Sequence, residues 1–483
     1  MTPDGFVALV GILIAVWAIM PEYRRFHLKL LCSWWDSLIL GLAFIVIVFL
    51  YFWRNYTFFP FSGYQANLCV FAVVLVVPTA GYFRLKYSRL KPERNKDAYD
   101  RFVNELMQAG KYHALSKFLK STAKQMIHRV EHKSLVESHS YNDFAGKFIC
   151  RIYENQDYLK YMAVAYPELG IELSVPDGFS ARTFQAKFLR VLLETDGSDL
   201  YREIATLNNK GIGYDIGNHT PALNSIFGNM SFAKKREVYR PAGDAMMAEL
   251  ERLSHSPETD QYNWEITQDF QEEDIHRSML FIGERYFDIM VTEALKQNTQ
   301  WHMWLYYYPH LMEHICKNYR LGPRNDPHTE FPNRYSMLIE QMFSSLCDWV
   351  RAIEHIPEGQ TNTKLNAVDL AHENDNIPKS SLIAMEQCLE IVLATEEIPY
   401  QFKQYMLSLI FNLYFELRQN ISHSRKDAHD YAKIILQMIP KLKSKPGCSE
   451  HIQGAWRDYD KIPHRHTPEQ ISYCKDLDSA ISP

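Results

Sequence analysis

Three long apolar runs stand out near the start of the chain. Residues 6–20, 37–53 and 66–83 contain no charged side chain. A helix needs about 20 mostly apolar residues, and at least about 17, to cross the hydrocarbon core of a bilayer. The second and third runs reach this length with their aromatic flanks, whereas the first is short and ends at Pro21. These runs predict three transmembrane helices in a membrane domain of residues 1–96.

After residue 97 the apolar residues recur at the spacing of an amphipathic helix. Tyr99, Phe102, Val103 and Leu106, for example, fall on one face of a helix with about 3.6 residues per turn. Alternating patterns typical of strands are almost absent. We therefore predict an all-α fold, in which a large multi-helix module follows the membrane helices. Helices are expected at residues 98–107, 114–130, 180–194, 274–296, 334–355, 381–395, 400–417 and 427–439.

Polar and proline-containing segments divide this helical part of the chain. The clearest linker is residues 356–379, which are rich in Asn, Pro and charged side chains. We predict one helical domain at residues 97–255, a second at 256–355 and a helical bundle at 380–443. The remaining segment, residues 444–483, contains scattered prolines and glycines. It is predicted to be an irregular tail.

The placement of Lys and Arg predicts the orientation in the membrane. Arg24, Arg25 and Lys29 lie between the first and second apolar runs, and only Arg54 lies between the second and third. Positive residues concentrate in cytoplasmic loops. We therefore expect the N-terminus outside and residues 84–483 in the cytoplasm of a multi-pass protein in a bacterial inner membrane, in contact with membrane lipid. The largest cluster follows the third run: Arg84, Lys86, Arg89, Lys91, Arg94 and Lys96.

Composition narrows the class of protein without naming an activity. Hydrophobic residues make up 47% and charged residues 23% of the 483 residues, which excludes wholesale disorder. The net charge is −5, and the acidic excess lies after residue 96, so a general nucleic-acid-binding role is disfavoured. The eight cysteines are scattered without a Cys-x-x-Cys pair, which is typical of reduced thiols rather than a disulfide framework.

One short motif points to RNA cleavage. Arg418 is followed after four residues by His423, between the helices expected at 400–417 and 427–439. This arrangement resembles the motif of the HEPN ribonucleases, which are small helical bundles that often act as toxins or defence effectors. The resemblance covers residues 380–439 and implies a composite site across a homodimer. The His would move a proton at the 2′-hydroxyl and the Arg would hold the phosphate. The alternative is a helix-end Arg followed by an exposed His.

A second motif points to zinc. His310 and His314 are four residues apart, so on a helix both imidazoles share one face and could bind one Zn²⁺. Glu313 could then act as a base toward a metal-bound water. The pattern resembles the H-x-x-E-H motif of the inverted zincin peptidases. Glu340 and Glu354 are available as a third ligand, but neither is singled out by its setting. The alternative is a pair of solvated or buried histidines without metal.

These observations favour a non-catalytic protein without a cofactor. We predict a membrane-anchored cytoplasmic helical scaffold or sensor that binds a protein partner through its helical faces. The first alternative is a membrane-tethered HEPN-like ribonuclease that acts on RNA as a homodimer through Arg418 and His423. The second alternative is a zinc-dependent hydrolase that uses His310, Glu313 and His314.

Overall fold

The protein is described here by a computed structural model, in which every regular element of the described residues is a helix and none is a strand. The predicted all-α class is therefore confirmed for this part of the chain. The described residues are 11, 15, 18–31, 45, 96–131, 148–149, 151–174, 179–207, 213–266, 278–299, 303–322, 325–329, 331–356, 376–419, 426–460 and 468–481.

The chain forms two compact units, Met1–Gln185 and Ala186–Pro483, here called the N-terminal and the C-terminal unit. This division is coarser than the one expected from the sequence, whose domain boundaries stay predictions. Helix α10 (Phe179–Glu194) begins in the first unit and ends in the second. The other helices of the N-terminal unit are α2 (Glu22–Leu31), α5 (Lys96–Gln108), α6 (Tyr112–Glu131), α8 (Gln156–Ala165) and α9 (Pro167–Ser174).

Aromatic side chains form the centre of the N-terminal unit. The ring of Phe26 on α2 stacks on that of Phe102 on α5, with centroids 3.8 Å apart, and Phe118 of α6 meets both edge-on. Offset and edge-to-face ring pairs add to the free energy gained by burying the rings. The hydroxyl of buried Tyr99 is satisfied by Thr122 Oγ1 at 2.7 Å. Helices α2, α5 and α6 are thus joined by one small core.

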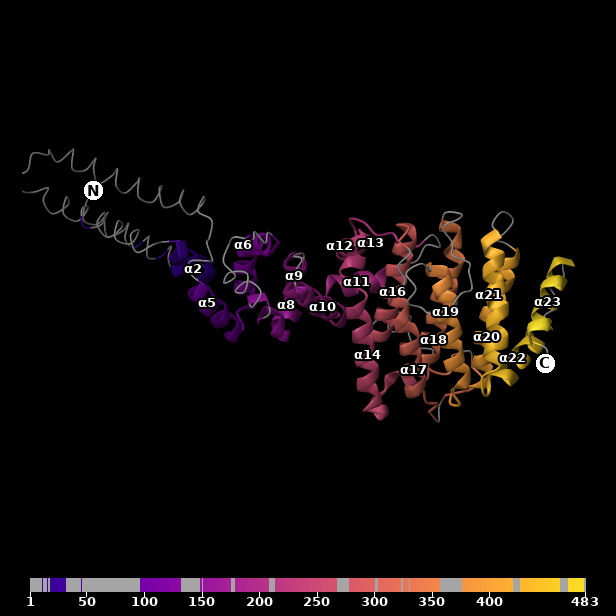
Figure 1. Ribbon diagram of the computed structural model, residues 1–483. Helices are drawn as coiled ribbons and strands as arrows, with labels where there is room; N and C mark the ends of the chain where they lie inside the picture. The colour runs from indigo at the N-terminus through magenta and orange to yellow at the C-terminus, as the bar shows by residue number, and fades with distance from the viewer. Residues whose placement is uncertain are drawn as a thin grey trace, which may run out of the picture. The chain divides into compact units, whose positions relative to one another are not determined.

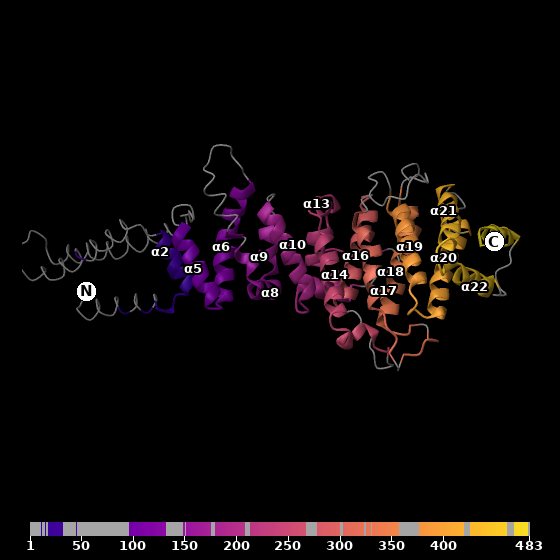
Figure 2. The same cartoon turned by 60° about the horizontal axis from the view of Figure 1, so that its bottom comes forward.

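The C-terminal unit contains the longer helices, and each packs mainly on helices close to it in sequence. Helix α14 contacts α16 and α17; α17 and α18 contact α19; α20 contacts α21 and α22. Figures 1 and 2 both show these helices as a row from α14 to α23. Serial packing of this kind is typical of α-solenoid arrays. In such an array a helix packs against a neighbour on each of two sides, and so buries two of its faces. The helices are α11 (Asp199–Thr206), α12 (Pro221–Phe227), α13 (Met230–Lys235), α14 (Arg240–Ser254), α16 (Met279–Lys296), α17 (Tyr307–Asn318), α18 (Arg334–Arg351), α19 (Ile377–Ala394), α20 (Tyr400–Gln419), α21 (Lys426–Lys443), α22 (Cys448–Asp460) and α23 (Pro468–Ile481).

The irregular tail predicted for residues 444–483 is wrong, because this segment forms α22 and α23. Gly447, with φ of +77°, ends the turn after α21 in a conformation that suits glycine. Pro446 and Gly447 thus lie between α21 and α22, Pro468 occupies the first position of α23, and Gly454 is accommodated within α22. Helical spacing is present within the segment, and most of its large apolar side chains are buried, with Ile471 exposed at 44%: the buried ones are Ile452, Ala455, Trp456, Tyr459, Leu477 and Ile481.

The three predicted spans, residues 6–20, 37–53 and 66–83, lie outside the described residues apart from a few isolated positions. Among the residues that are described, no helix combines the length and the apolar character that crossing a membrane requires. The spans therefore stay a prediction from the sequence. Most of the predicted linker, residues 356–379, also lies outside the described residues, and its last three residues begin α19.

Candidate functional site

The Arg418 motif lies at a helix junction, as expected. Arg418 is in the last turn of α20, and α21 begins at Lys426, so both predicted flanking helices are confirmed. His423 lies outside the described residues. Whether it approaches Arg418, and whether two chains join to form a composite site, stays a prediction.

The guanidinium of Arg418 is held by α23, the helix that was predicted to be tail. Its Nη2 donates to Asp476 Oδ2 at 3.1 Å, and its guanidinium carbon lies 4.5 Å from the ring centroid of Tyr473. Tyr473 donates in return to the Arg418 carbonyl oxygen at 3.4 Å. The Arg418 side chain is 19% exposed. A phosphate that bound this guanidinium bidentately would therefore compete with the Asp476 carboxylate.

The zinc motif lies on α17, with different exposure at its three residues. His310 and Glu313 are exposed, and His314 is half-buried. Within the part of the chain that is described, no group of three or more His, Cys, Asp or Glu side chains is arranged to hold a metal ion. Glu340 accepts a hydrogen bond from Ser344 at 2.7 Å, and the side chain of Glu354 lies outside the described residues. The zinc site stays a prediction.

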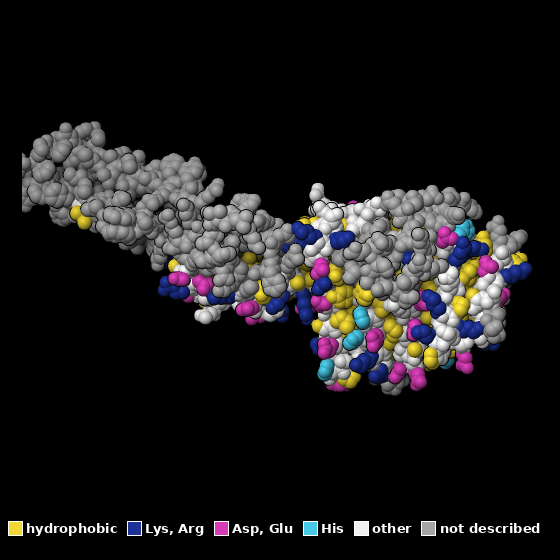
Figure 3. Space-filling view, in the orientation of Figure 1, with side chains coloured by type: hydrophobic (Ala, Val, Ile, Leu, Met, Phe, Trp, Pro, Cys, Tyr) yellow, Lys and Arg dark blue, Asp and Glu magenta, His cyan; other side chains and the backbone are white. Residues whose placement is uncertain are grey.

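Glu313 also borders a groove of about 690 Å³ between α17 and the end of α19. Its lining mixes carboxylates, among them Glu396 and Glu397, with the cations Lys317 and Arg320. Glu390 of this lining pairs with Lys445 at 2.8 Å. Acidic and basic side chains alternate with apolar ones on the face of the C-terminal unit seen in Figure 3. Such a surface suits a polar partner more than an apolar ligand.

Sequence reasoning missed a carboxyl group in the interior of the C-terminal unit. Glu284 of α16 is 1% exposed and accepts hydrogen bonds from two side chains of α18, Gln341 Nε2 at 2.5 Å and Ser345 Oγ at 2.7 Å. Burial, reinforced by the nearby Asp288 carboxylate, raises the pKa of Glu284 to about 8. A carboxyl pKa raised this far is typical of functional sites and of buried structural networks.

Asp288, one turn later on α16, belongs to the same network. It is partly buried and accepts from Tyr214 Oη at 2.5 Å and from Trp349 Nε1 at 3.0 Å. Burial raises its pKa as well. All four carboxylate oxygens of the pair are thus occupied by protein donors, which indicates a structural network that joins α16 to α18. The i, i+4 spacing of two acids in a mostly apolar stretch of α16 was the available signal, but the same spacing is also typical of a solvated helix face.

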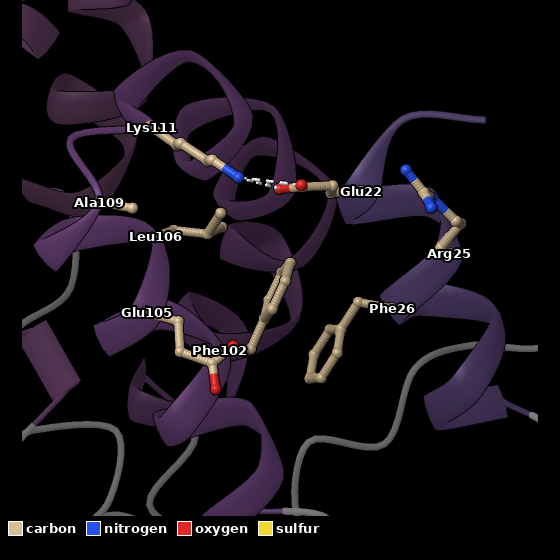
Figure 4. A pocket seen from close by; sticks show the side chains of 8 residues that line it. All are labelled: Glu22, Arg25, Phe26, Phe102, Glu105, Leu106, Ala109 and Lys111. Atoms are coloured by element: carbon tan, nitrogen blue, oxygen red, sulfur yellow. Dashed lines mark hydrogen bonds and ion pairs between the residues drawn. The ribbon is translucent and has the colours of Figure 1, made fainter. Parts of the chain in front are cut away.

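The N-terminal unit contains a pocket of about 410 Å³ between α2 and α5, which is shown in Figure 4. Lys111 Nζ bridges both carboxylate oxygens of Glu22 at 2.9 Å across its upper edge. This ion pair lowers the pKa of Glu22. The pocket combines charged side chains with aromatic and aliphatic ones. Its lining is Glu22, Arg25, Phe26, Phe102, Glu105, Leu106, Ala109 and Lys111.

Comparison with known proteins adds no relative: no protein-family model, curated protein or solved structure matches the chain.

Proposed function

We propose that the chain is a membrane-anchored helical scaffold or sensor whose C-terminal unit binds a protein partner in the cytoplasm. The observation that carries the proposal is the packing of α2 on α5 and α6. Helix α2 lies between the first and second predicted spans, and α5 follows the third. A contact between these helices therefore indicates whether the two segments lie on the same side of the membrane.

The contact between α2 and α5 requires both helices to lie on the same side of the membrane. Phe26 stacks on Phe102, and Glu22 pairs with Lys111. The predicted spans 37–53 and 66–83 separate these helices in sequence, and two crossings return the chain to the side from which it left. The packing thus supports two crossings between α2 and α5, which the alternation of positive charges along the sequence also predicts. A single crossing between the two helices would place them on opposite sides.

The serial array of the C-terminal unit supports the scaffold part of the proposal. Stacked helices present an extended surface that can bind a partner over several helices at once. The groove between α17 and α19, with its exposed Glu396 and Glu397 and its mixed charges, is the part of this surface that we expect a partner to contact first.

Topology can be tested with protease-cleavable epitopes inserted in the full-length chain. An epitope after residue 60, between the second and third spans, should be cut when protease is added to intact spheroplasts. A matched epitope after residue 366, in the predicted linker, should be cut only after lysis. Equal protection of both sites, or release of the chain from membranes by alkaline carbonate, would contradict the anchor.

Partner binding can be tested by site-specific photo-crosslinking in cells. A crosslinker at Glu397 should give a discrete heteromeric band, whereas the same group at exposed Glu251 on α14 should not. The absence of a band at 397, with the chain folded and in the membrane, would contradict binding at this groove.

A second candidate is the HEPN-like ribonuclease, which is favoured by the position of Arg418 at the α20–α21 junction. Purified protein and an Arg418→Ala/His423→Ala variant would each be incubated with total RNA and tRNA in EDTA. Cleavage by the wild type alone would support this candidate. Asp476→Asn should then increase the cleavage, because it removes the carboxylate that competes for Arg418.

A further inference from the structure

We propose that the pocket between α2 and α5 binds one zwitterionic aminophospholipid of the phosphatidylethanolamine class from the cytoplasmic leaflet. The phosphate would bind Arg25, the ammonium would bind Glu105, and the glycerol and first acyl carbons would lie on the aromatic wall. This inference rests on the proposed membrane anchor, because the lipid is available only if α2 lies at the membrane surface.

The charges of the pocket favour a ligand with both signs. Of its four charged side chains, Glu22 and Lys111 neutralise each other in a two-oxygen ion pair. The other two are one carboxylate, Glu105, and one guanidinium, Arg25, whose charge also helps to lower the pKa of Glu22 without forming an ion pair with it. Neither side chain forms an ion pair within the described residues, and the buried Nε atom of Arg25 has no hydrogen-bond partner there. A purely anionic headgroup would satisfy Arg25 and leave Glu105 facing a like charge.

The rest of the pocket is apolar. Phe26 and Phe102 stack at 3.8 Å, and the wall continues with Leu106 of α5 and with Ala109 in the turn that follows α5. In Figure 4 the two rings lie between Arg25 on one side and Glu105 on the other, below the pair formed by Glu22 and Lys111. A wall of this kind between charged groups suits an amphiphile, whose apolar part would gain little from a wholly polar site. A free phosphate or amine would leave this wall uncovered.

The position of α2 places the pocket at the depth of lipid headgroups. The first predicted span ends at residue 20, and α2 begins at Glu22. An α-helix rises about 1.5 Å per residue, so Phe26 is within roughly 8 Å of the start of α2 whatever direction the helix takes. The headgroup layer on each side of a bilayer is about 5–8 Å thick. The lining residues of α2 therefore lie where headgroup phosphates and ammonium groups are concentrated.

The test uses full-length protein, delipidated in detergent and titrated separately with three phospholipids that share their acyl chains. The headgroups are ethanolamine, choline and glycerol, and native mass spectrometry counts the bound lipid. Water-soluble glycerophosphoethanolamine forms a fourth arm, which separates a membrane lipid from a free headgroup. We expect one ethanolamine lipid per chain, bound about tenfold more tightly than the choline lipid, whose methylated nitrogen cannot donate to a carboxylate. We expect the free headgroup to bind at least tenfold more weakly than the lipid.

Two variants and one matched control make the proposal falsifiable. Arg25→Gln should weaken binding of the ethanolamine lipid about tenfold, and Glu105→Gln should shift preference toward the anionic glycerol lipid. Arg24→Gln is the control, because Arg24 is the exposed neighbour whose guanidinium lies over the Tyr23 ring. Equal binding of all three lipids, equal effects of Arg24→Gln and Arg25→Gln, or binding of the free headgroup as tight as that of the lipid would overturn the proposal.

Failure of the pocket and failure of the anchor give different results. If the chain resists carbonate extraction but shows no lipid preference, the pocket proposal fails and the anchor stands. If carbonate releases the chain, the anchor fails, and the lipid site loses its premise. Circular dichroism of each variant confirms that loss of binding does not reflect loss of the helical fold.

Discussion

Charged side chains at the α2–α5 contact of the N-terminal unit lie at the rim of an open pocket, whereas Glu284 of the C-terminal unit lies in the interior. The pair Lys111–Glu22 is about half exposed, at 50% and 48%, and Glu284 is 1% exposed. An exposed ion pair contributes roughly 0–1 kcal/mol to the free energy of unfolding. A buried carboxyl group that loses its partners costs several times more, because its desolvation is no longer compensated. Charged side chains therefore contribute differently in the two units. At the pocket rim of the N-terminal unit they add little to stability, whereas in the C-terminal unit the buried carboxyl group connects two helices.

The largest effect is expected from removing the buried carboxyl group. Glu284→Ala leaves a cavity and deprives Gln341 and Ser345 of their acceptor, so the free energy of unfolding should fall by about 3 kcal/mol. Thermal unfolding followed by circular dichroism measures the change. Glu313→Ala, at an exposed position of α17, is the control and should change stability by less than about 0.5 kcal/mol. Similar effects of the two substitutions would contradict the expectation that a buried carboxyl group contributes more to stability than an exposed one.

The next largest effect is a dependence of stability on pH that Glu284 should cause and the exposed Lys111–Glu22 pair should not. The pKa of Glu284 is about 8 in the folded chain, against an ordinary value of 4.5. The folded state therefore holds this proton more tightly, and the stabilisation is complete below about pH 4.5 and lost as the pH rises through about 8. Between pH 6 and 9 the Tm of the wild type should fall more steeply than that of Glu284→Gln, which cannot ionise. Parallel curves would show that Glu284 does not titrate in this range.

An intermediate effect is expected from the aromatic contact of the N-terminal unit. Phe26→Ala removes the ring that stacks on Phe102 and meets Phe118, and should cost about 2 kcal/mol for a half-buried ring. Hydrogen exchange of α5 and α6 should speed up, whereas exchange of α18 should not change. Phe232→Ala, at an exposed position of α13 where the ring lies against the guanidinium of Arg236, is a control for loss of a phenyl ring outside the N-terminal unit. Unchanged exchange in α5 would contradict the packing of α2 on this helix.

The smallest effect is expected at the ion pair above the pocket. Lys111→Gln should lower stability by less than about 1 kcal/mol, and the loss should shrink further in high salt, because exposed charges are screened. The measurement is the Tm of wild type and variant at low and high ionic strength. A loss as large as that of Glu284→Ala would mean that the ion pair at the pocket rim contributes as much to stability as the buried carboxyl group.

The long amphipathic helices were predicted from the sequence, because their apolar spacing and their burial agree, whereas the shorter helices α8, α9 and α11–α13, and also α14, were not predicted. The expected helix at 400–417 corresponds to α20, Tyr400–Gln419, and the one at 98–107 to α5, Lys96–Gln108. Helices α22 and α23 were missed because Pro and Gly at their borders weighed more than the apolar spacing between them. A single chain shows where breakers occur, but not whether they interrupt a helix or separate two.

The surroundings of the candidate residues could not be predicted. Asp476 lies 58 residues from Arg418, and nothing in the local sequence of either residue indicates that they meet. Glu284 occupies a position that faces solvent in an ordinary amphipathic helix, and only the packing of α18 shows that it is buried. In both cases the surroundings of the side chain are set by contacts with a segment that is distant in sequence. Local periodicity therefore predicted the helices better than it predicted their chemistry.

Because its helices stack in sequence order, the C-terminal unit can bend by small changes at many helix–helix interfaces. Each helix from α14 to α23 is held mainly by its near neighbours in the row, so no single contact fixes the two ends against each other. A small rotation repeated at successive interfaces adds up to a large displacement over the row. Tension applied at one end would therefore be shared as gentle bending among many interfaces, and the array could lengthen or coil without any helix unfolding.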